Sequence, residues 1–142
     1  MAFLADISAW SVAQRRGAPA DLRDEFRDLL LDDAIATCGV VRWELLHSTN
    51  NGAEFAARRA SLAALRSCAI DDADFEVALD LCERLDALDG GSAHRALKLQ
   101  DALVAVAARN AELPVLHYDA EFDRIARITG QPTRWIRPRG SL

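Results

Sequence analysis

The chain has 142 residues, 51% of them hydrophobic, which is enough for one core and too apolar for disorder. Its net charge of −5 at pH 7 argues against a nucleic-acid partner held by overall charge alone. Three scattered cysteines without CxxC or Cys/His spacing indicate neither a disulfide framework nor a zinc site. We therefore expect one domain over residues 1–142, with reduced thiols that suit the cytoplasm.

In the first half of the chain, apolar runs and turn signals predict strands that alternate with helices. The run before Asp6 is short and apolar, as in a buried strand, and Ser8 is placed to cap the helix that follows. The predicted elements are a strand over 2–5, a short helix capped by Ser8, a helix over 21–31, a strand over 34–37 and a helix over 40–48.

The second half continues the alternation. A long helix has Phe75, Ala78, Leu79, Cys82 and Leu85 as its predicted inner face, and the helix after Asp101 is apolar all round. The predicted elements are a helix over 54–65, a strand over 68–70, a helix over 71–88, a helix over 101–109, a strand over 113–117, a helix over 119–130 and a strand over 133–136. This order predicts right-handed βαβ units and a parallel sheet, an α/β fold.

Charge is unevenly distributed. Residues 1–123 carry 12 basic and 22 acidic residues, whereas the tail from Arg124 has five arginines and no acid. The tail is either a solvated basic end or a strip that contacts phosphates or a partner. No uncharged apolar run approaches the ~20 residues of a membrane helix, and Asp6 comes too early for a signal peptide, so we expect no membrane contact.

Four acids stand at or near the junctions of apolar segments, where parallel sheets build their sites. Asp6 ends the first strand, Asp101 opens an apolar helix, and Asp119 follows a strand, so each could also be only a turn or cap residue. Glu44 lies beside the apolar stripe of its helix, where an unpaired charge is costly. Asp123 is one turn beyond Asp119 and could assist it.

The positions of these acids converge at one edge of a parallel sheet. Carboxylates held together repel, so some should have raised pKa values until a cation binds. Oxygen ligands without cysteine or histidine favour Mg²⁺ or Mn²⁺. Such a site can activate water against a phosphodiester. Glu121 is expected to point elsewhere.

Four stretches of the chain resemble the PIN domain, and within that family a VapC-type ribonuclease toxin. They are Phe3–Trp10, Val41–Leu46, Gln100–Ala107 and Pro114–Ala126, in the family's order. The resemblance implies a three-layer α/β/α sandwich with a short parallel sheet. It also implies that Asp6, Glu44, Asp101 and Asp119 bind the metal, chiefly Asp6 and Asp101, with Asp123 as an accessory acid. Ser8 matches a hydroxyl residue that supports the first Asp, whereas Ile7 stands where the family often has Thr or Ser.

The same resemblance implies a function. The family's VapC members are metal-dependent endoribonucleases that cut structured RNA, are silenced by a VapB antitoxin, and form homodimers. Bridging cations and rim arginines would let an acidic chain bind RNA. His94 and Arg95 either touch substrate or are ordinary loop residues, and His47 and His117 are expected to be structural.

Two other classes of protein compete with this interpretation. A phospho-acceptor receiver domain needs a lysine at a late strand end, and the only lysine, Lys98, follows no strand. All four acids are present, so the sequence shows no degeneration of the site, but a catalytically weak PIN-fold module whose main role is binding its antitoxin stays open as the alternative.

Overall fold

The computed structural model describes residues 1–142 as an α/β fold built on five parallel strands. The strands are β1 (Phe3–Ala5), β2 (Ile35–Cys38), β3 (Arg66–Cys68), β4 (Val115–His117) and β5 (Thr133–Trp135). They lie in the order β3-β2-β1-β4-β5, with β1 at the centre between β2 and β4. The predicted parallel sheet is therefore confirmed.

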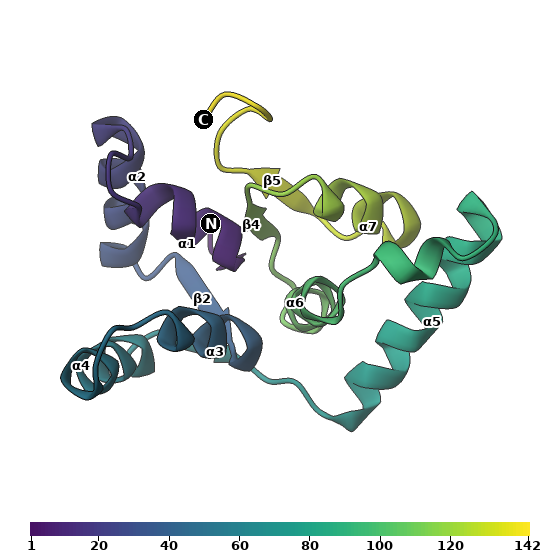
Figure 1. The fold of residues 1–142 in the computed structure, drawn as a ribbon, viewed down its shortest axis with the longest axis horizontal. Coiled ribbons are helices and arrows are strands. Elements are labelled where there is room, and N and C mark those ends of the chain that lie inside the picture. The colour runs from purple at the N-terminus through teal and green to yellow at the C-terminus, as the bar shows by residue number, and fades with distance from the viewer.

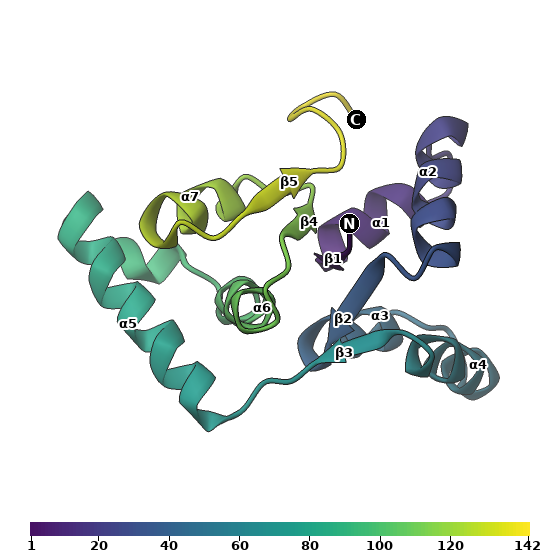
Figure 2. The same cartoon turned by 180° about the vertical axis from the view of Figure 1, so that it is seen from behind.

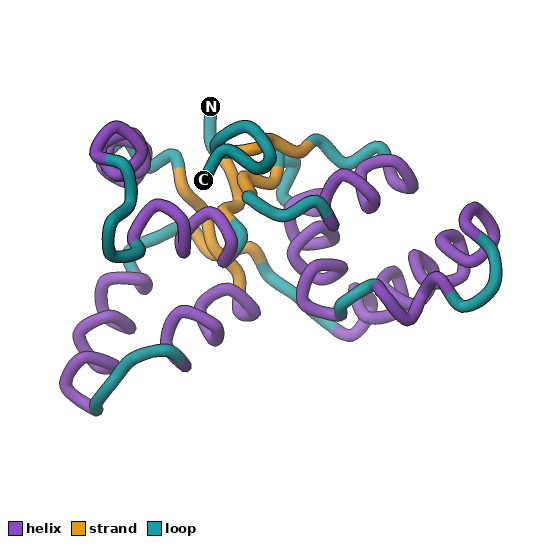
Figure 3. The backbone as a smooth tube through the Cα atoms, turned by 45° about the horizontal axis from the view of Figure 1, so that its top comes forward, coloured by secondary structure: helices purple, strands orange, loops and turns teal.

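Helices cover both faces of this sheet. They are α1 (Ile7–Gln14), α2 (Ala20–Leu31), α3 (Gly39–His47), α4 (Gly52–Ala63), α5 (Asp72–Asp89), α6 (Leu99–Asn110), α7 (Glu121–Thr129) and the short 3-10 helix η1 (Ala93–Ala96). Every residue of β1, β2 and β4 is buried, which requires cover on both sides. Figure 3 shows the strands at the centre with helices on either side, the predicted three-layer α/β/α sandwich.

The core has two parts. The larger joins the sheet to α1, α2 and α3 and includes Leu4, Phe26 and Val41; the smaller lies where α5 and α7 pack on α6. Figures 1 and 2 show α4 and α5 at opposite ends of the molecule, with α6 between them. None of the helices combines the length and apolarity that a membrane crossing requires.

The predicted inner face of α5 is partly wrong. Phe75 and Leu79 are 42% and 59% exposed, whereas Ala78, Leu81 and Leu85 are buried. The buried face repeats at positions 74, 78, 81 and 85, so it shares positions 78 and 85 with the predicted face but has positions 74 and 81 in place of 75, 79 and 82. The long helix carries apolar residues on two adjacent stripes, and its packing on α6 selects one of them.

Two predicted caps also differ from the structure. Asp6, and not Ser8, is the N-cap of α1, and Ser8 donates to it. Helix α6 begins at Leu99, so Asp101 lies inside its first turn instead of capping it. Strand β3 ends at Cys68, where the predicted strand begins, because the segment to Ile70 already leads toward α5.

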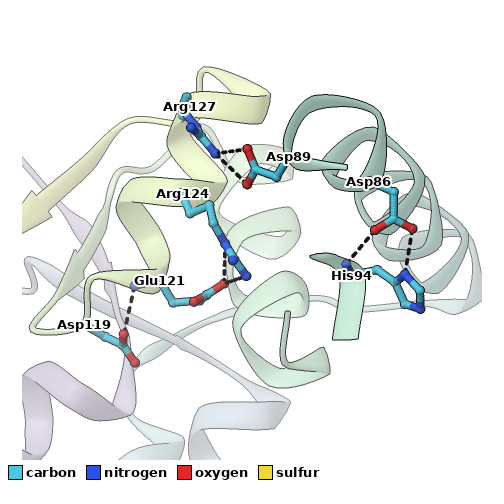
Figure 4. Close-up of polar contacts among 7 residues, drawn as sticks. All are labelled: Asp86, Asp89, His94, Asp119, Glu121, Arg124 and Arg127. Carbon is cyan, nitrogen blue, oxygen red and sulfur yellow. Dashed lines mark hydrogen bonds and ion pairs between the residues drawn. The ribbon is translucent and has the colours of Figure 1, made fainter. Parts of the chain in front are cut away.

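The basic tail folds back onto the molecule. Arg137 pairs with Asp21 at 3.1 Å and with Glu25 of α2, and Arg134 approaches Glu25 at 3.6 Å. The two earlier arginines, Arg124 and Arg127, pair with Glu121 and Asp89 (Figure 4). Four of the five tail arginines thus have acidic partners within the chain, so the tail is not a free basic strip.

Candidate metal centre

Asp6 is held at the centre of the site by Ser8. The carboxylate is only 2% exposed and follows the central strand β1 directly. The backbone N–H and the hydroxyl of Ser8 donate to Asp6 Oδ2 at 3.0 and 2.6 Å, and the same hydroxyl oxygen accepts the Tyr118 N–H at 2.9 Å. Ser8 therefore ties the end of β1 to the end of β4, the support expected of it. Burial raises the pKa of Asp6, although the bonds from Ser8 lower it.

Asp101 has the most strongly raised pKa of the four acids. It is 7% exposed in the first turn of α6, and its Oδ2 has no hydrogen-bond partner. Burial raises the pKa of Asp101 to about 7, the negative charges of Asp6 and Asp119 add to the rise, and Lys98 opposes it. A buried carboxylate oxygen without a donor is costly, so this oxygen is available to a cation.

Glu44 reaches the same region from α3. Its side chain is half-buried, and Oε1 is buried without a hydrogen-bond partner. Burial raises the pKa of Glu44, Asp6 raises it further, and Lys98 again opposes the rise. The negative charge of Asp6 thus raises the pKa of both Glu44 and Asp101, so both of these acids lie within its electrostatic field.

Asp119 approaches from the loop after β4. Its Oδ1 accepts the Glu121 N–H at 2.9 Å, a contact at the start of α7 (Figure 4). Its own N–H donates to His117 Nδ1 at 3.2 Å. Its negative charge raises the pKa of both Asp6 and Asp101. Asp119 is therefore a helix-capping residue that also faces the other acids.

Two acids of α7 differ from their predicted places. Asp123 is exposed and accepts the Trp135 Nε1–H at 3.0 Å, so the structure places it outside the group formed by the other four. Glu121, expected to point elsewhere, raises the pKa of Asp101 while pairing with Arg124 at 2.7 Å (Figure 4). Its position two residues after Asp119, in the first turn of α7, is the signal that could have indicated this.

Lys98 is the cation that sequence reasoning left out of the site. It immediately precedes α6 and lowers the pKa of both Glu44 and Asp101. Its spacing of three residues before Asp101 was the available signal. The positive charge offsets part of the repulsion among the acids.

The histidines have separate roles. His94 of η1 is engaged with α5, because its N–H and Nδ1 contact Asp86 at 2.7 and 2.6 Å, which lowers the pKa of Asp86 (Figure 4). His117 is fully buried between Phe122 and Trp135, and burial lowers its pKa. These contacts agree with a structural role for His117.

The acids are gathered but not closed into a cage. No three Asp, Glu, His or Cys side chains are arranged closely enough to hold a metal ion as they stand. The unpartnered oxygens of Glu44 and Asp101 nevertheless form a hard-oxygen donor set that fits Mg²⁺ or Mn²⁺. Beside Glu44 opens a cavity of about 710 Å³ between α1, α3 and α6, large enough for part of a substrate.

Comparison with known proteins agrees with this geometry. The model of the PIN domain matches residues 4–128. Ribonuclease VapC18 of Mycobacterium tuberculosis is 37% identical over 142 residues and all of both chains, and Ribonuclease VapC51 of the same species is 33% identical over 132 residues, 93% of each. The chain thus belongs to the PIN-domain family. Its place within that family is the VapC-type branch.

Solved structures show the same fold at low sequence identity. A VapBC2 structure from Rickettsia felis, bound to a promoter DNA fragment, matches with a TM-score of 0.64 and 13% identity over 95% of this chain and 99% of the other. FitAcB from Neisseria gonorrhoeae also has a TM-score of 0.64, with 14% identity over 94% and 97% of the two chains. These similarities support the fold assignment.

Proposed function

We propose that this chain is the toxin of a type II toxin–antitoxin pair, an endoribonuclease that hydrolyses phosphodiester bonds of RNA with Mg²⁺ or Mn²⁺. One observation carries the proposal. Glu44 and Asp101 have buried, unpartnered oxygens, and both feel the charge of Asp6, in a chain that is 37% identical, over its full length, to Ribonuclease VapC18. A fold does not need such oxygens, and a divalent cation would satisfy them.

The four acids divide the work in this proposal. Asp6 and Asp101 hold the cation, which supplies charge stabilisation at the phosphate and a more acidic water. Glu44, half-buried and with a raised pKa, accepts a proton from the attacking water. Asp119 keeps one oxygen in its cap and directs the other toward the group. Asp123, predicted as an accessory ligand, is left outside the direct ligands because it is exposed and is not among the charges that raise the pKa of Asp6, Glu44 or Asp101.

We also propose a cognate VapB-type antitoxin and a homodimer as the assemblies of this chain, with residues 1–142 acting as one unit in the cytoplasm. Relatives of the same fold were solved as VapBC and FitAB assemblies, some with DNA. The alternative is a catalytically weak PIN-fold module whose main role is binding its antitoxin. The open arrangement of the acids is the observation that favours it.

An RNA cleavage assay with Mg²⁺ or Mn²⁺ separates these functions. Asp6→Asn and Asp101→Asn should each lose roughly 100-fold or more in rate, since even outer partners of metal ligands are worth 10- to 100-fold. Asp80→Asn, an exposed acid on α5, is the matched control and should cut like wild type. Equal cleavage by all four proteins would refute the metal site. A wild type that binds Mg²⁺ by calorimetry but cuts no RNA would favour the binding module.

A further inference from the structure

Trp43 is a large aromatic side chain that the fold does not use. It is 71% exposed on α3 and belongs to neither part of the core. Its ring stacks on His47, one turn further along, with centroids 5.8 Å apart and planes 15° apart. An exposed indole held flat against a second ring presents a fixed aromatic face on which the base of a nucleotide can stack.

The platform opens onto the acidic site. Trp43 and Glu44 are consecutive residues, and both line the cavity of about 710 Å³ between α1, α3 and α6. Gln100, next to Asp101, lines the same cavity. A nucleotide whose phosphate lies at the acids would therefore have its neighbouring base beside Trp43.

The far end of the cavity is positively charged. A second hollow of about 240 Å³ shares Ile7, Ser11 and Ser48 with the first, so the two form one groove along α1 and α3. This end is lined by Arg15 and Arg58. Figure 1 shows α3 and α4 side by side, with α1 above them.

Both arginines are uncommitted. Arg58 donates only to the neutral Gln14 Oε1, at 3.0 Å, and Arg15 makes no ion pair. Four of the five tail arginines, in contrast, are neutralised by acids of the chain. The groove thus has two unpaired arginines at one end and the Trp43 ring beside the acids. This combination fits a single-stranded polyanion, since proteins bind unpaired RNA through base stacking and phosphate contacts.

We propose that an unpaired base next to the scissile phosphate stacks on Trp43, and that the RNA strand continues along the groove so that a further phosphate contacts Arg15 and Arg58. This inference rests on the proposed ribonuclease function and gives the substrate a direction across the molecule. It also gives the site a preference for unpaired over paired RNA at that nucleotide, because a paired base cannot leave its helix to stack on the indole.

Steady-state cleavage of a single-stranded oligoribonucleotide that the wild type cuts tests the stacking platform. Trp43→Ala should lower kcat/KM roughly 5- to 150-fold, mainly through KM, because base stacking on an aromatic side chain is worth about 1–3 kcal/mol. Trp43→Phe should recover most of the loss. Phe75→Ala, an exposed aromatic of α5 outside the groove, is the control and should leave kcat/KM unchanged.

A matched arginine pair tests the path of the strand. Arg58→Gln should raise KM and reduce the salt dependence of binding, with a slope smaller by about 0.7 for one lost phosphate contact on a single strand. Arg59→Gln removes the same charge from the next residue of α4, which lies outside the groove, and should change neither. Thermal unfolding of each variant verifies that the fold is intact.

Substrates with one abasic nucleotide distinguish base stacking on Trp43 from a purely structural role of this residue. Removing the stacked base should weaken cleavage by the wild type but add no further loss in Trp43→Ala. The stacking site is wrong if Trp43→Ala cuts the intact oligonucleotide and every abasic oligonucleotide with the same kcat/KM as the wild-type protein. In that case the ribonuclease function still stands. If Trp43→Ala weakens only antitoxin binding, the groove belongs to a protein partner and the inference fails. If the wild type neither binds nor cuts RNA, the proposed function fails first and the stacking site with it.

Discussion

Replacing Asp101 with asparagine should stabilise the metal-free protein, and more strongly as the pH rises. Burial and neighbouring acids raise the pKa of Asp101 from 3.8 to about 7, so the folded state keeps a proton that the unfolded chain releases. A raised carboxyl pKa means that wild-type stability falls as the pH increases from about 4 to about 7. Asparagine has the shape of the protonated acid and never becomes charged, so the variant escapes this loss.

The size of the effect follows from the same pKa. At about 1.4 kcal/mol for each pH unit, the rise to about 7 costs the wild type about 4 kcal/mol at pH 8 and about 1.5 kcal/mol at pH 5. The stability gained by Asp101→Asn should therefore grow by about 2.5 kcal/mol between these pH values. For a chain of this length, that difference corresponds to roughly 5–10 °C in Tm.

Thermal unfolding of both proteins in a chelator at pH 5 and pH 8 measures this difference. Adding Mg²⁺ at pH 8 should then raise the Tm of the wild type, by about 2.7 kcal/mol of stability at 100 times Kd, and raise that of Asp101→Asn much less. A variant that is less stable than wild type at pH 8, or a difference that does not grow with pH, would show that Asp101 is not a strained carboxylate awaiting a cation.

Three further predictions concern the support of the site and the packing of the fold. Ser8→Ala removes the hydroxyl that donates to Asp6 and accepts the Tyr118 N–H, and it should cost about 1–3 kcal/mol in urea unfolding together with a loss of Mg²⁺ affinity, whereas Ser8→Thr should retain both; an unchanged affinity in Ser8→Ala would contradict the support role. Leu81→Ala, 3% exposed, should cost about 2–5 kcal/mol, and Leu79→Ala, 59% exposed, less than about 0.5 kcal/mol, so the reverse order would refute the observed face of α5. Gly130→Ala should cost about 1 kcal/mol in the same unfolding assay because Gly130 ends α7 at a φ of 74°, and a neutral result would show that this turn can relax.

Local patterns predict most of the fold because each strand and helix is short and distinct. The five strands and the sheet type follow from apolar runs separated by helical periodicity, and their ends are displaced by only a few residues. The phase of α5 does not follow, because Phe75, Leu79 and Cys82 form as regular a stripe as Ala78, Leu81 and Leu85. Only contacts with α6 and α7, distant in sequence, distinguish the two faces.

For the charged residues too, positions set by local sequence could be predicted, whereas contacts between distant parts of the chain could not. The acids at strand ends were predictable, since parallel strands bring their carboxyl ends to one edge. The ion pairs of Arg137 could not be predicted, because its partners Asp21 and Glu25 lie more than a hundred residues earlier in the chain. The effect of Glu121 on Asp101 also joins residues of two helices, α7 and α6, and the only local signal for it was the place of Glu121 two residues after Asp119.

From the sequence, Asp6 and Asp119 could each be either a helix cap or a metal ligand. The structure shows that one residue can have both roles. Both Ser8 bonds end on Oδ2 of Asp6, and the Glu121 N–H binds Oδ1 of Asp119, so in each case the second oxygen stays outside the capping contact. The capping bonds fix the direction of that free oxygen, as the outer partners of a metal site do for its ligands. Glu44 and Asp101 each have a buried oxygen without a hydrogen-bond partner, which is why we expect them to respond most to a cation. Two fixed carboxylates beside two strained ones are therefore an arrangement that a divalent ion can both organise and stabilise.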